Sequence, residues 1–343
     1  MSQPEEGIRY LAAAEVARLV SRLDVPAVIR QTLLAYAKGA AGMSPEAAVR
    51  WTTGSGHAAR SLILPGWADG SYGCKIINAS LGNVDHGLPR AAGLVVLSDP
   101  ETARPVCIME GARISALRTA ATSVVAIAAV REPAAATRLA ILGCGRQSET
   151  HLELLAPLAL SLREVRLFDL DPERARRFAT RCRNLLDADK QIRVTSTARE
   201  AVEGVALTVA ATTTTEPYVD LDWLSPGGTF VNVSLDDATE GLLLGADHLI
   251  VDDWELVRTD EHRLLGRLAA AGRVVGPDAP TPDGSRRVDT EIPRLLAGEY
   301  TRPVTATDRL VINPFGMGVS DIGLAAAVLD LARQTGDGTL ISC

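Results

Sequence analysis

The fold is decided by the stretch Leu139-Ala140-Ile141-Leu142-Gly143-Cys144-Gly145-Arg146-Gln147, an apolar run that ends in a Gly-x-Gly turn. Two dozen residues later a second apolar run, Val165-Arg166-Leu167-Phe168-Asp169, ends in an acid. A strand, a glycine turn, a helix and a second strand closed by an acid are typical of a dinucleotide site. The glycines let the backbone approach the pyrophosphate, which lies at the helix N-terminus, and the acid accepts hydrogen bonds from the ribose. The pattern therefore predicts a nicotinamide or flavin dinucleotide site.

Two details refine this prediction. Ser148 stands where the dinucleotide pattern has its third glycine. Asp169 has no adjacent Arg or Ser, and a carboxylate repels a 2′-phosphate, so the sequence favours NAD over NADP.

Strand-like runs alternate with helical stretches from Thr137 onward, which predicts an α/β fold with a Rossmann doubly wound parallel sheet. The alternation is expected to stop near Leu310, and a final helix is expected from about Asp321 to Arg333. The expected strands are 139–142, 165–169, 192–195, 207–211, 229–233 and 248–251.

The residues before Thr137 follow a different pattern. Residues 12–38 predict two helices that are separated near Pro26, and residues 112–130 predict a long Ala-rich helix. Strand-like runs lie between them, with a hairpin turn at Asp99-Pro100-Glu101-Thr102, around residues 49–51, 61–65, 74–78, 92–97 and 105–109.

Composition excludes several classes of protein. The 343 residues are 47% hydrophobic with a net charge of −7, and the basic residues are scattered, so no nucleic-acid partner is expected. Five widely spaced cysteines form neither a disulfide framework nor a metal pattern, which fits a reducing compartment. Residues 1–10 do not resemble a signal peptide, and no uninterrupted apolar run is long enough to span a bilayer. We therefore expect a cytoplasmic protein with no membrane partner and no metal.

Three cations lie in apolar surroundings, namely Arg50, Lys75 and Arg118. A charge inside a strand or an apolar helix is costly unless it is paired, and clustered cations suit a substrate carboxylate. Each of the three has the alternative of an internal salt bridge, or of reaching solvent.

Two neighbouring acids, Asp236 and Asp237, follow the expected strand 229–233, at the edge where ligands of open α/β sheets bind. One of them is a candidate general base, and the alternative is a helix cap. The Thr212–Thr215 run follows another strand and either lines the cofactor or forms a turn. The five histidines show no metal-ligand spacing and are expected to be structural or exposed, and Ser80 and the cysteines have no nearby base.

Taken together, the chain resembles the ornithine cyclodeaminase/μ-crystallin family over almost its whole length. The motifs that carry the resemblance are Lys75, Arg118-Thr119-Ala120-Ala121-Thr122-Ser123, Gly143-x-Gly145-x-Gln147, Asp169, Asp237 and Gly316-x-Gly318-x-x-Asp321. The family's own loop carries the glutamine at Gln147, which accounts for the missing third glycine.

The resemblance implies a role for each matched residue. Arg50, Lys75 and Arg118 would hold the substrate carboxylate, and Asp237 would be the acid/base, a choice over Asp236 that rests on the family motif. NAD would contact Thr119, Gly143, Gly145, Arg146, Gln147, Asp169, Thr212, Thr213, Val233 and Ser234. The family fold implies an α+β substrate-binding and dimerisation domain of residues 1–118 plus 314–343, with the Rossmann domain, residues 119–313, inserted into it.

Further motifs are similar to the branch that forms L-2,3-diaminopropionate for siderophores and peptide antibiotics. These motifs are residues 91–102, 251–254 and 312–318. The resemblance implies NAD-dependent oxidative cleavage of a glutamate–diaminopropionate secondary amine to diaminopropionate and 2-oxoglutarate by a homodimer. Asp237 would then accept the amine proton and activate water, while Lys75 would orient the carboxylate and polarise the imine carbon. Arg90 would add a cation for a substrate with three carboxylates, or would be a surface charge.

Two other functions stay open. The first is an ornithine or lysine cyclodeaminase, or a related alanine dehydrogenase or ketimine reductase. The second is a non-catalytic NAD-dependent binding protein, against which the presence of both Lys75 and Asp237 argues.

Overall fold

The computed structural model describes residues 7–342, and the chain divides into two compact units. The first unit contains residues 1–118 and 316–343, and the second contains residues 119–315. The chain passes between them twice, first within helix α3 (Ala112–Val130) and then after Phe315. Residues 1–6, which belong to the segment that we do not expect to be a signal peptide, and Cys343 lie outside the described residues.

An eight-stranded sheet forms the first unit, with order β18-β1-β7-β6-β5-β4-β2 and β3 paired to β4. Its pairs are antiparallel except β1 with β7. The strands are β1 (Ile8–Leu11), β2 (Gly42–Met43), β3 (Ala47–Thr52), β4 (Ala58–Ala68), β5 (Ser71–Ser80), β6 (Ala91–Ser98), β7 (Pro105–Glu110) and β18 (Thr339–Ile341).

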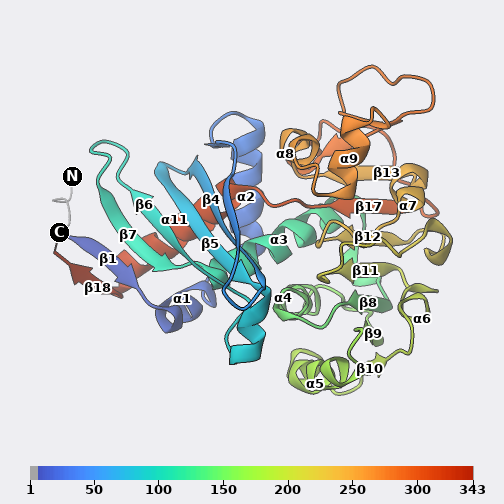
Figure 1. Ribbon diagram of the computed structural model, residues 1–343, viewed down its shortest axis with the longest axis horizontal. Coiled ribbons are helices and arrows are strands. Elements are labelled where there is room, and N and C mark those ends of the chain that lie inside the picture. The colour runs from blue at the N-terminus through green and yellow to red at the C-terminus, as the bar shows by residue number, and fades with distance from the viewer. Residues whose placement is uncertain (1–6, 343) are drawn as a thin grey trace. The chain divides into compact units, whose positions relative to one another are not determined.

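Helices α1 (Ala13–Val20), α2 (Val25–Ala37) and α11 (Gly318–Thr335) complete this unit, together with the 3₁₀ turn η1 (Leu81–His86). The long helix α11 runs along the sheet and packs against β4, β5 and α2 (Figure 1). Most of its side chains are buried, which its sequence allows because it is apolar nearly all round. One sheet face is thereby covered.

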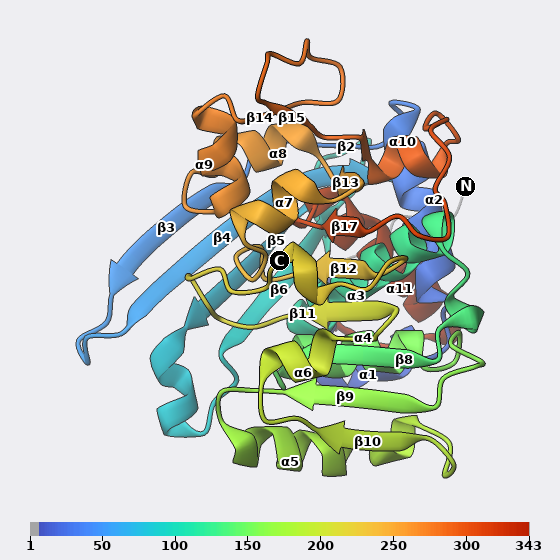
Figure 2. The ribbon, with the colours of Figure 1, turned by 90° about the vertical axis from the view of Figure 1, so that its right-hand side faces the viewer.

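A second eight-stranded sheet, all parallel, forms the second unit, with order β10-β9-β8-β11-β12-β17-β13-β16 (Figure 2). Its central strands are buried on both faces, as expected where helices cover both sides of a parallel sheet. The strands are β8 (Arg138–Leu142), β9 (Glu164–Phe168), β10 (Gln191–Val194), β11 (Leu207–Ala210), β12 (Thr229–Asn232), β13 (His248–Val251), β16 (Thr290–Glu291) and β17 (Leu310–Asn313).

The remaining elements of this unit are short. Strands β14 (Val274–Val275) and β15 (Arg286–Arg287) pair separately from the main sheet. The helices are α4 (Arg146–Leu155), α5 (Pro172–Cys182), α6 (Ala198–Val202), α7 (Glu240–Gly245), α8 (Trp254–Thr259), α9 (Leu264–Ala270) and α10 (Ile292–Leu296), and the 3₁₀ turns are η2 (Pro133–Ala135), η3 (Arg183–Leu185) and η4 (Leu221–Trp223).

The expected fold class is confirmed, with two corrections to its elements. The alternation does not stop at Leu310, because 310–313 form β17, which inserts between β12 and β13 in the sheet. The final helix begins at Gly318, about one turn before the expected start at Asp321.

By length and composition alone, helix α3 is long and apolar enough to cross a membrane, although its apolar residues do not form one uninterrupted run. It is the only such helix in residues 7–342, and 67% of its apolar window is buried in the protein, as in a core helix. Cys74, Cys107, Cys144 and Cys182 are all free thiols.

Candidate functional site

A buried cluster of two cations and one acid lies in the first unit. Lys75, on β5, donates from Nζ to Asp321 Oδ2 at 2.8 Å and to Ser115 Oγ at 3.1 Å. Arg118, on α3, donates from Nε to the other oxygen of the same carboxylate at 3.0 Å. Lys75 is 1% exposed, Arg118 7% and Asp321 0%. One carboxylate therefore contacts two buried cations, and Glu46 acts on Lys75 as a second negative charge.

Burial, and after it the nearby Arg118, lower the pKa of Lys75 to about 8, against the opposing effect of Asp321. Asp321 comes from the first turn of α11, far along the sequence from both cations. Gly316 belongs to the same motif and has φ of +116°, and a Cβ there would lie 2.7 Å from Arg118 Nη1. Gly316 thus leaves space for the guanidinium of Arg118, and Asp321 binds that guanidinium.

The other two predicted substrate cations lie at different places in the first unit. Arg50 is exposed on β3, the strand that pairs with β4. Arg90 is exposed in the segment before β6, where its carbonyl accepts from Ser80 N at 3.0 Å. Both therefore differ from the buried pair of Lys75 and Arg118.

The predicted dinucleotide turn lies between β8 and α4 in the second unit. Gly143 has φ of +84°, and a Cβ there would lie 2.7 Å from the carbonyl oxygen of Ala211, so only glycine fits. Gly145 is the N-cap of α4 and has open space at its Cβ position. Ser148, in place of the third glycine, is buried and its hydroxyl donates to the carbonyl oxygen of Gly143. Ser148 therefore links the glycine turn to helix α4 by a hydrogen bond.

Asp169 follows β9 and contacts the same turn. Its Oδ2 accepts from Cys144 N at 2.8 Å, and its Oδ1 accepts from Asp171 N at 3.0 Å. The carboxylate retains further acceptor positions, so it can also accept from a ribose. Burial raises the pKa of the Cys144 thiol to about 12, which keeps it protonated and unreactive.

Arg146 and Gln147 form the first turn of α4. Arg146 is exposed and Gln147 half-buried, and the carbonyl of Gln147 accepts from the ring of His151 at 2.8 Å. Thr119, half-buried on α3, accepts from Ser123 Oγ at its carbonyl.

The second acid of the predicted pair, Asp237, lies in a set of hydroxyl groups. It is 0% exposed, and three hydroxyls donate to it: Thr212 Oγ1 at 2.7 Å, Tyr218 Oη at 3.0 Å, and Ser234 Oγ. Burial raises the pKa of this carboxyl, and the three hydrogen bonds oppose that effect. These three partners are neutral hydroxyls, so Asp237 can gain or lose a proton without breaking an ion pair with them.

The neighbouring Asp236 has different partners. Its Oδ2 accepts from Arg263 Nη1 at 2.6 Å, and its Oδ1 accepts from Leu264 N at 2.9 Å, at the start of α9. It is thus a paired acid and a helix-end acceptor, the alternative that the sequence left open. Of the two acids, Asp237 has the environment that a proton-transfer group needs.

Thr212 donates from Oγ1 to Asp237, and its backbone N–H donates to Ser234 Oγ at 2.9 Å. Thr213 next to it is exposed, and Val233 is half-buried just past β12. These residues, the glycine turn and Asp169 all follow the carboxyl ends of parallel strands, around the switch point between β8 and β11. At the same edge Asn232 Oδ1 is buried and accepts no hydrogen bond from residues 7–342. The turn, the helix N-terminus and the acid therefore fit a dinucleotide.

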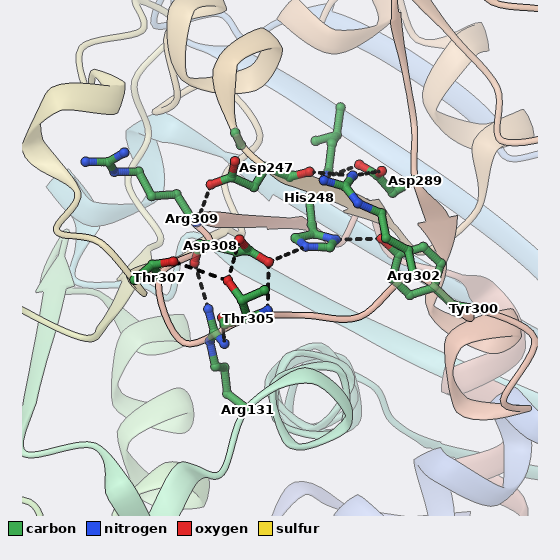
Figure 3. A network of polar contacts seen from close by, with 12 residues as sticks. Arg131, Asp247, His248, Asp289, Tyr300, Arg302, Thr305, Thr307, Asp308 and Arg309 are labelled. Atoms are coloured by element: carbon green, nitrogen blue, oxygen red, sulfur yellow. Dashed lines mark hydrogen bonds and ion pairs between the residues drawn. The ribbon is translucent and has the colours of Figure 1, made fainter.

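The histidines do not form a metal site. No group of three His, Cys, Asp or Glu side chains that could hold a metal occurs in residues 7–342. His248, at the start of β13, is fully buried and contacts Tyr300 Oη and Asp308 Oδ2 at 2.5 and 3.0 Å (Figure 3). Thr305 and Arg131 extend the network and fasten the loop before β17. The contacts of His248 therefore indicate a structural role.

A model of the ornithine cyclodeaminase/mu-crystallin family matches residues 8–336. The chain belongs to this family. The predicted family is thereby confirmed.

The family includes several activities, and the chain is related to more than one of them. It is 28% identical over 293 residues to the N-((2S)-2-amino-2-carboxyethyl)-L-glutamate dehydrogenase of Staphylococcus aureus, covering 84% of each chain. It is 24% identical to the alanine dehydrogenase of Archaeoglobus fulgidus, covering 96% of this chain and 97% of that one. The crystal structure of CmnK aligns with a TM-score of 0.88 at 33% identity, covering 98% of each chain.

Sequence reasoning gave no role to two groups of this family member that contact predicted site residues, one in each unit. Asp321 was named only as part of a motif, although an acid at the start of an apolar helix itself indicates a buried charge pair. Tyr218 carried no signal, because its contact with Asp237 depends on how the loop after β11 folds.

Proposed function

We propose that the chain is an NAD-dependent dehydrogenase that cleaves a glutamate–diaminopropionate secondary amine into L-2,3-diaminopropionate and 2-oxoglutarate. The observation that carries the proposal is Asp237, a buried carboxylate held by three hydroxyls. It lies in the unit that has the dinucleotide turn. The likeness to the Staphylococcus aureus dehydrogenase supports the choice of substrate.

NAD would be held by the turn from Gly143 to Gln147 and by Asp169, with Thr119, Thr212, Thr213, Val233 and Ser234 as further contacts. When bound, NAD supplies the hydride acceptor that converts the glutamate-side C–N bond into an imine. The carboxylate of Asp169 opposes a 2′-phosphate, so NAD is preferred to NADP.

The residues of the chain would supply the remaining chemistry. Asp237 takes the extra proton of the substrate ammonium, which leaves a neutral amine, and releases that proton to solvent. As carboxylate again, it takes a proton from the water that adds to the imine carbon. Asp237 returns this proton to the diaminopropionate nitrogen and takes the proton of the new hydroxyl as the C–N bond breaks, which gives the ketone of 2-oxoglutarate and the free amine.

Lys75, Arg118 and Arg50 would bind carboxylate groups of the substrate, with Arg90 as a further cation. Lys75 and Arg118 share one acid, and an ammonium and a guanidinium have several donors each, so both can also donate to an anion. Lys75 would also polarise the developing imine carbon.

We further propose a homodimer in the cytoplasm, serving siderophore or peptide-antibiotic biosynthesis. The face of the first sheet opposite Lys75 exposes large apolar side chains, which a second copy would cover. They include Trp51, Ile63, Tyr72 and Leu94.

The test is NADH formation, followed by absorbance, from NAD and the glutamate–diaminopropionate conjugate, with ornithine and lysine in parallel. NADH from the conjugate alone is the expected result. Ammonia release from a diamine without net NADH would establish a cyclodeaminase instead, and NAD binding without turnover of any amino acid would establish a binding protein.

A further inference from the structure

His151 is a buried titratable side chain of helix α4 to which the proposed reaction gives no role. It is 0% exposed, and its ring contacts two helices of the second unit. Nδ1 lies 2.8 Å from the carbonyl oxygen of Gln147, in the first turn of α4. Nε2 lies 3.0 Å from Oγ of Ser123, which is itself fully buried on α3. The imidazole therefore connects α3 to the start of α4.

The partners of the ring fix which nitrogen carries the proton. A carbonyl oxygen only accepts, so Nδ1 holds a hydrogen and donates it to Gln147. Burial lowers the pKa of His151 to about 4, against the opposing effect of the Gln147 carbonyl, and at neutral pH the ring is therefore uncharged with a single N–H. Nε2 then has a lone pair, which accepts from the hydroxyl of Ser123.

The hydroxyl of Ser123 has one proton and two acceptors within reach. Its Oγ lies 3.0 Å from Nε2 of His151 and 3.3 Å from the carbonyl oxygen of Thr119, one turn earlier on α3. That carbonyl accepts from the backbone of its own helix, whereas Nε2 of the buried ring would otherwise have no donor among residues 7–342. The proton therefore belongs to the contact with His151, and the donors follow one direction, from Ser123 through His151 to Gln147.

Both ends of this chain of hydrogen bonds lie beside positions that would contact NAD. Thr119 is one turn before Ser123 on α3, and Gln147 is in the first turn of α4, where the N–H groups of a helix face an anion. Groups that bind one ligand do so well only when the side chains behind them hold their relative positions. A neutral imidazole with one partner at each nitrogen supplies such a link and adds no charge near the site.

We propose that His151 is a positioning residue for NAD: it accepts from Ser123, donates to Gln147, and so holds the first turn of α4 in place relative to α3. It acts through these two residues, because its fully buried ring offers no surface to the cofactor. This rests on the proposed NAD contacts of Thr119 and Gln147 and deepens them, since it names the residue that sets their relative position.

The experiment compares the wild type with His151→Leu, Ser123→Ala, the double variant, and His151→Gln, whose amide oxygen can still accept from Ser123. His248→Leu is the matched control, because His248 is also a fully buried histidine of the second unit, in a network at the start of β13. Calorimetry measures the Kd of NAD without any amino-acid substrate, and urea titration measures stability. Nitrogen NMR of labelled histidine reports the tautomer of His151 in the wild type.

His151→Leu and Ser123→Ala are each expected to weaken NAD binding about three- to tenfold, the effect of losing a neutral hydrogen bond. The double variant should bind no more weakly than His151→Leu, because both changes break the same chain. His151→Gln should retain part of the affinity. His248→Leu should lower the urea midpoint and leave the Kd of NAD unchanged, and NMR should show the proton of His151 on Nδ1.

An unchanged Kd in both His151→Leu and Ser123→Ala, a proton on Nε2, or an equal rise of the Kd in His248→Leu overturns the assignment. Additive losses in the double variant also overturn it, since they would mean two independent effects. If the wild type binds NAD more tightly than both variants but oxidises no conjugate, the proposed reaction falls and the positioning role stands. If the wild type binds no NAD, both fall.

Discussion

Asp321 in the first unit and Asp237 in the second are both fully buried carboxylates, yet they have opposite partners. Two cations hold Asp321, and three neutral hydroxyls hold Asp237. A proton placed on Asp321 would remove the negative charge that Lys75 and Arg118 both contact, whereas a proton on Asp237 only rearranges hydrogen bonds. The partners of a buried acid thus decide whether it fixes a structure or moves a proton.

The largest effect is expected from Asp237→Asn. The amide keeps the shape of the side chain but cannot take a proton, so kcat for the conjugate should fall about 10²- to 10⁴-fold. Calorimetry should show unchanged NAD affinity. Asp236→Asn, which loosens the contact with Arg263, should lower the melting temperature and retain most of the turnover. If Asp236→Asn abolishes turnover and Asp237→Asn does not, the two roles are reversed.

The mirror experiment is Asp321→Asn. It leaves Lys75 and Arg118 buried without their acid, which should reduce the free energy of unfolding by about 3–5 kcal/mol in urea titrations. The exposed pair of Arg199 and Glu203 offers a control, because Glu203→Gln should leave the urea midpoint unchanged. An equal loss in the two variants would mean that the buried cluster adds nothing special.

The pH dependence of kcat/KM tests the role of Lys75 separately from the roles of the two acids. Lys75 holds a carboxylate only while it is charged, so kcat/KM should be present below pH 8 and fall as pH rises through its pKa of about 8. Lys75→Met should lower kcat/KM and remove this alkaline limb. Because the folded pKa lies below the ordinary 10.5, the unfolded chain binds more protons between about pH 8 and 10.5, and Lys75's contribution to stability rises with pH there. An alkaline limb that Lys75→Met retains would exclude Lys75 as its source.

The smallest effect is expected from Tyr218→Phe. It removes one of the three donors that stabilise ionised Asp237, so the pKa of that carboxyl should rise further. Activity requires the carboxylate, and the acid limb of kcat should therefore move to higher pH, with a loss of about two- to tenfold below neutrality. Tyr300→Phe, which removes a hydroxyl from the His248 network, should leave the limb in place. A limb that moves to lower pH in Tyr218→Phe would contradict the hydroxyl account.

The sequence predicted the elements that repeat a simple pattern. The central strand β8, its turn and helix α3 lie where their apolar periodicity placed them. Strand β17 was not predicted because its place between β12 and β13 depends on long-range pairing, which no local pattern encodes. Helix α11 starts earlier than expected because its first turn is buried rather than amphipathic.

The sequence predicted which side chains belong to the candidate site, but it predicted less well which side chains they contact. Lys75 and Arg118 stood out as charges in apolar runs, but their common acid lies 246 residues from Lys75, so the pairing needs the fold. Arg50 and Arg60, ten residues apart in sequence, likewise become neighbours only through the register of β3 and β4. The ion pair between Arg263 and Asp236 gives a physical reason to propose Asp237 rather than Asp236 as the base.

The central claim is that Asp237 serves an oxidation of a tricarboxylate amine, and one measurement tests it most directly. Purified protein, NAD and the glutamate–diaminopropionate conjugate are followed at the NADH absorbance band, with Asp237→Asn, ornithine and lysine alongside. The account predicts NADH and 2-oxoglutarate in equal amounts from the conjugate with the wild type, and almost none with the variant or the diamines. Ammonia from a diamine with no net NADH, or equal rates in the two proteins, would contradict it.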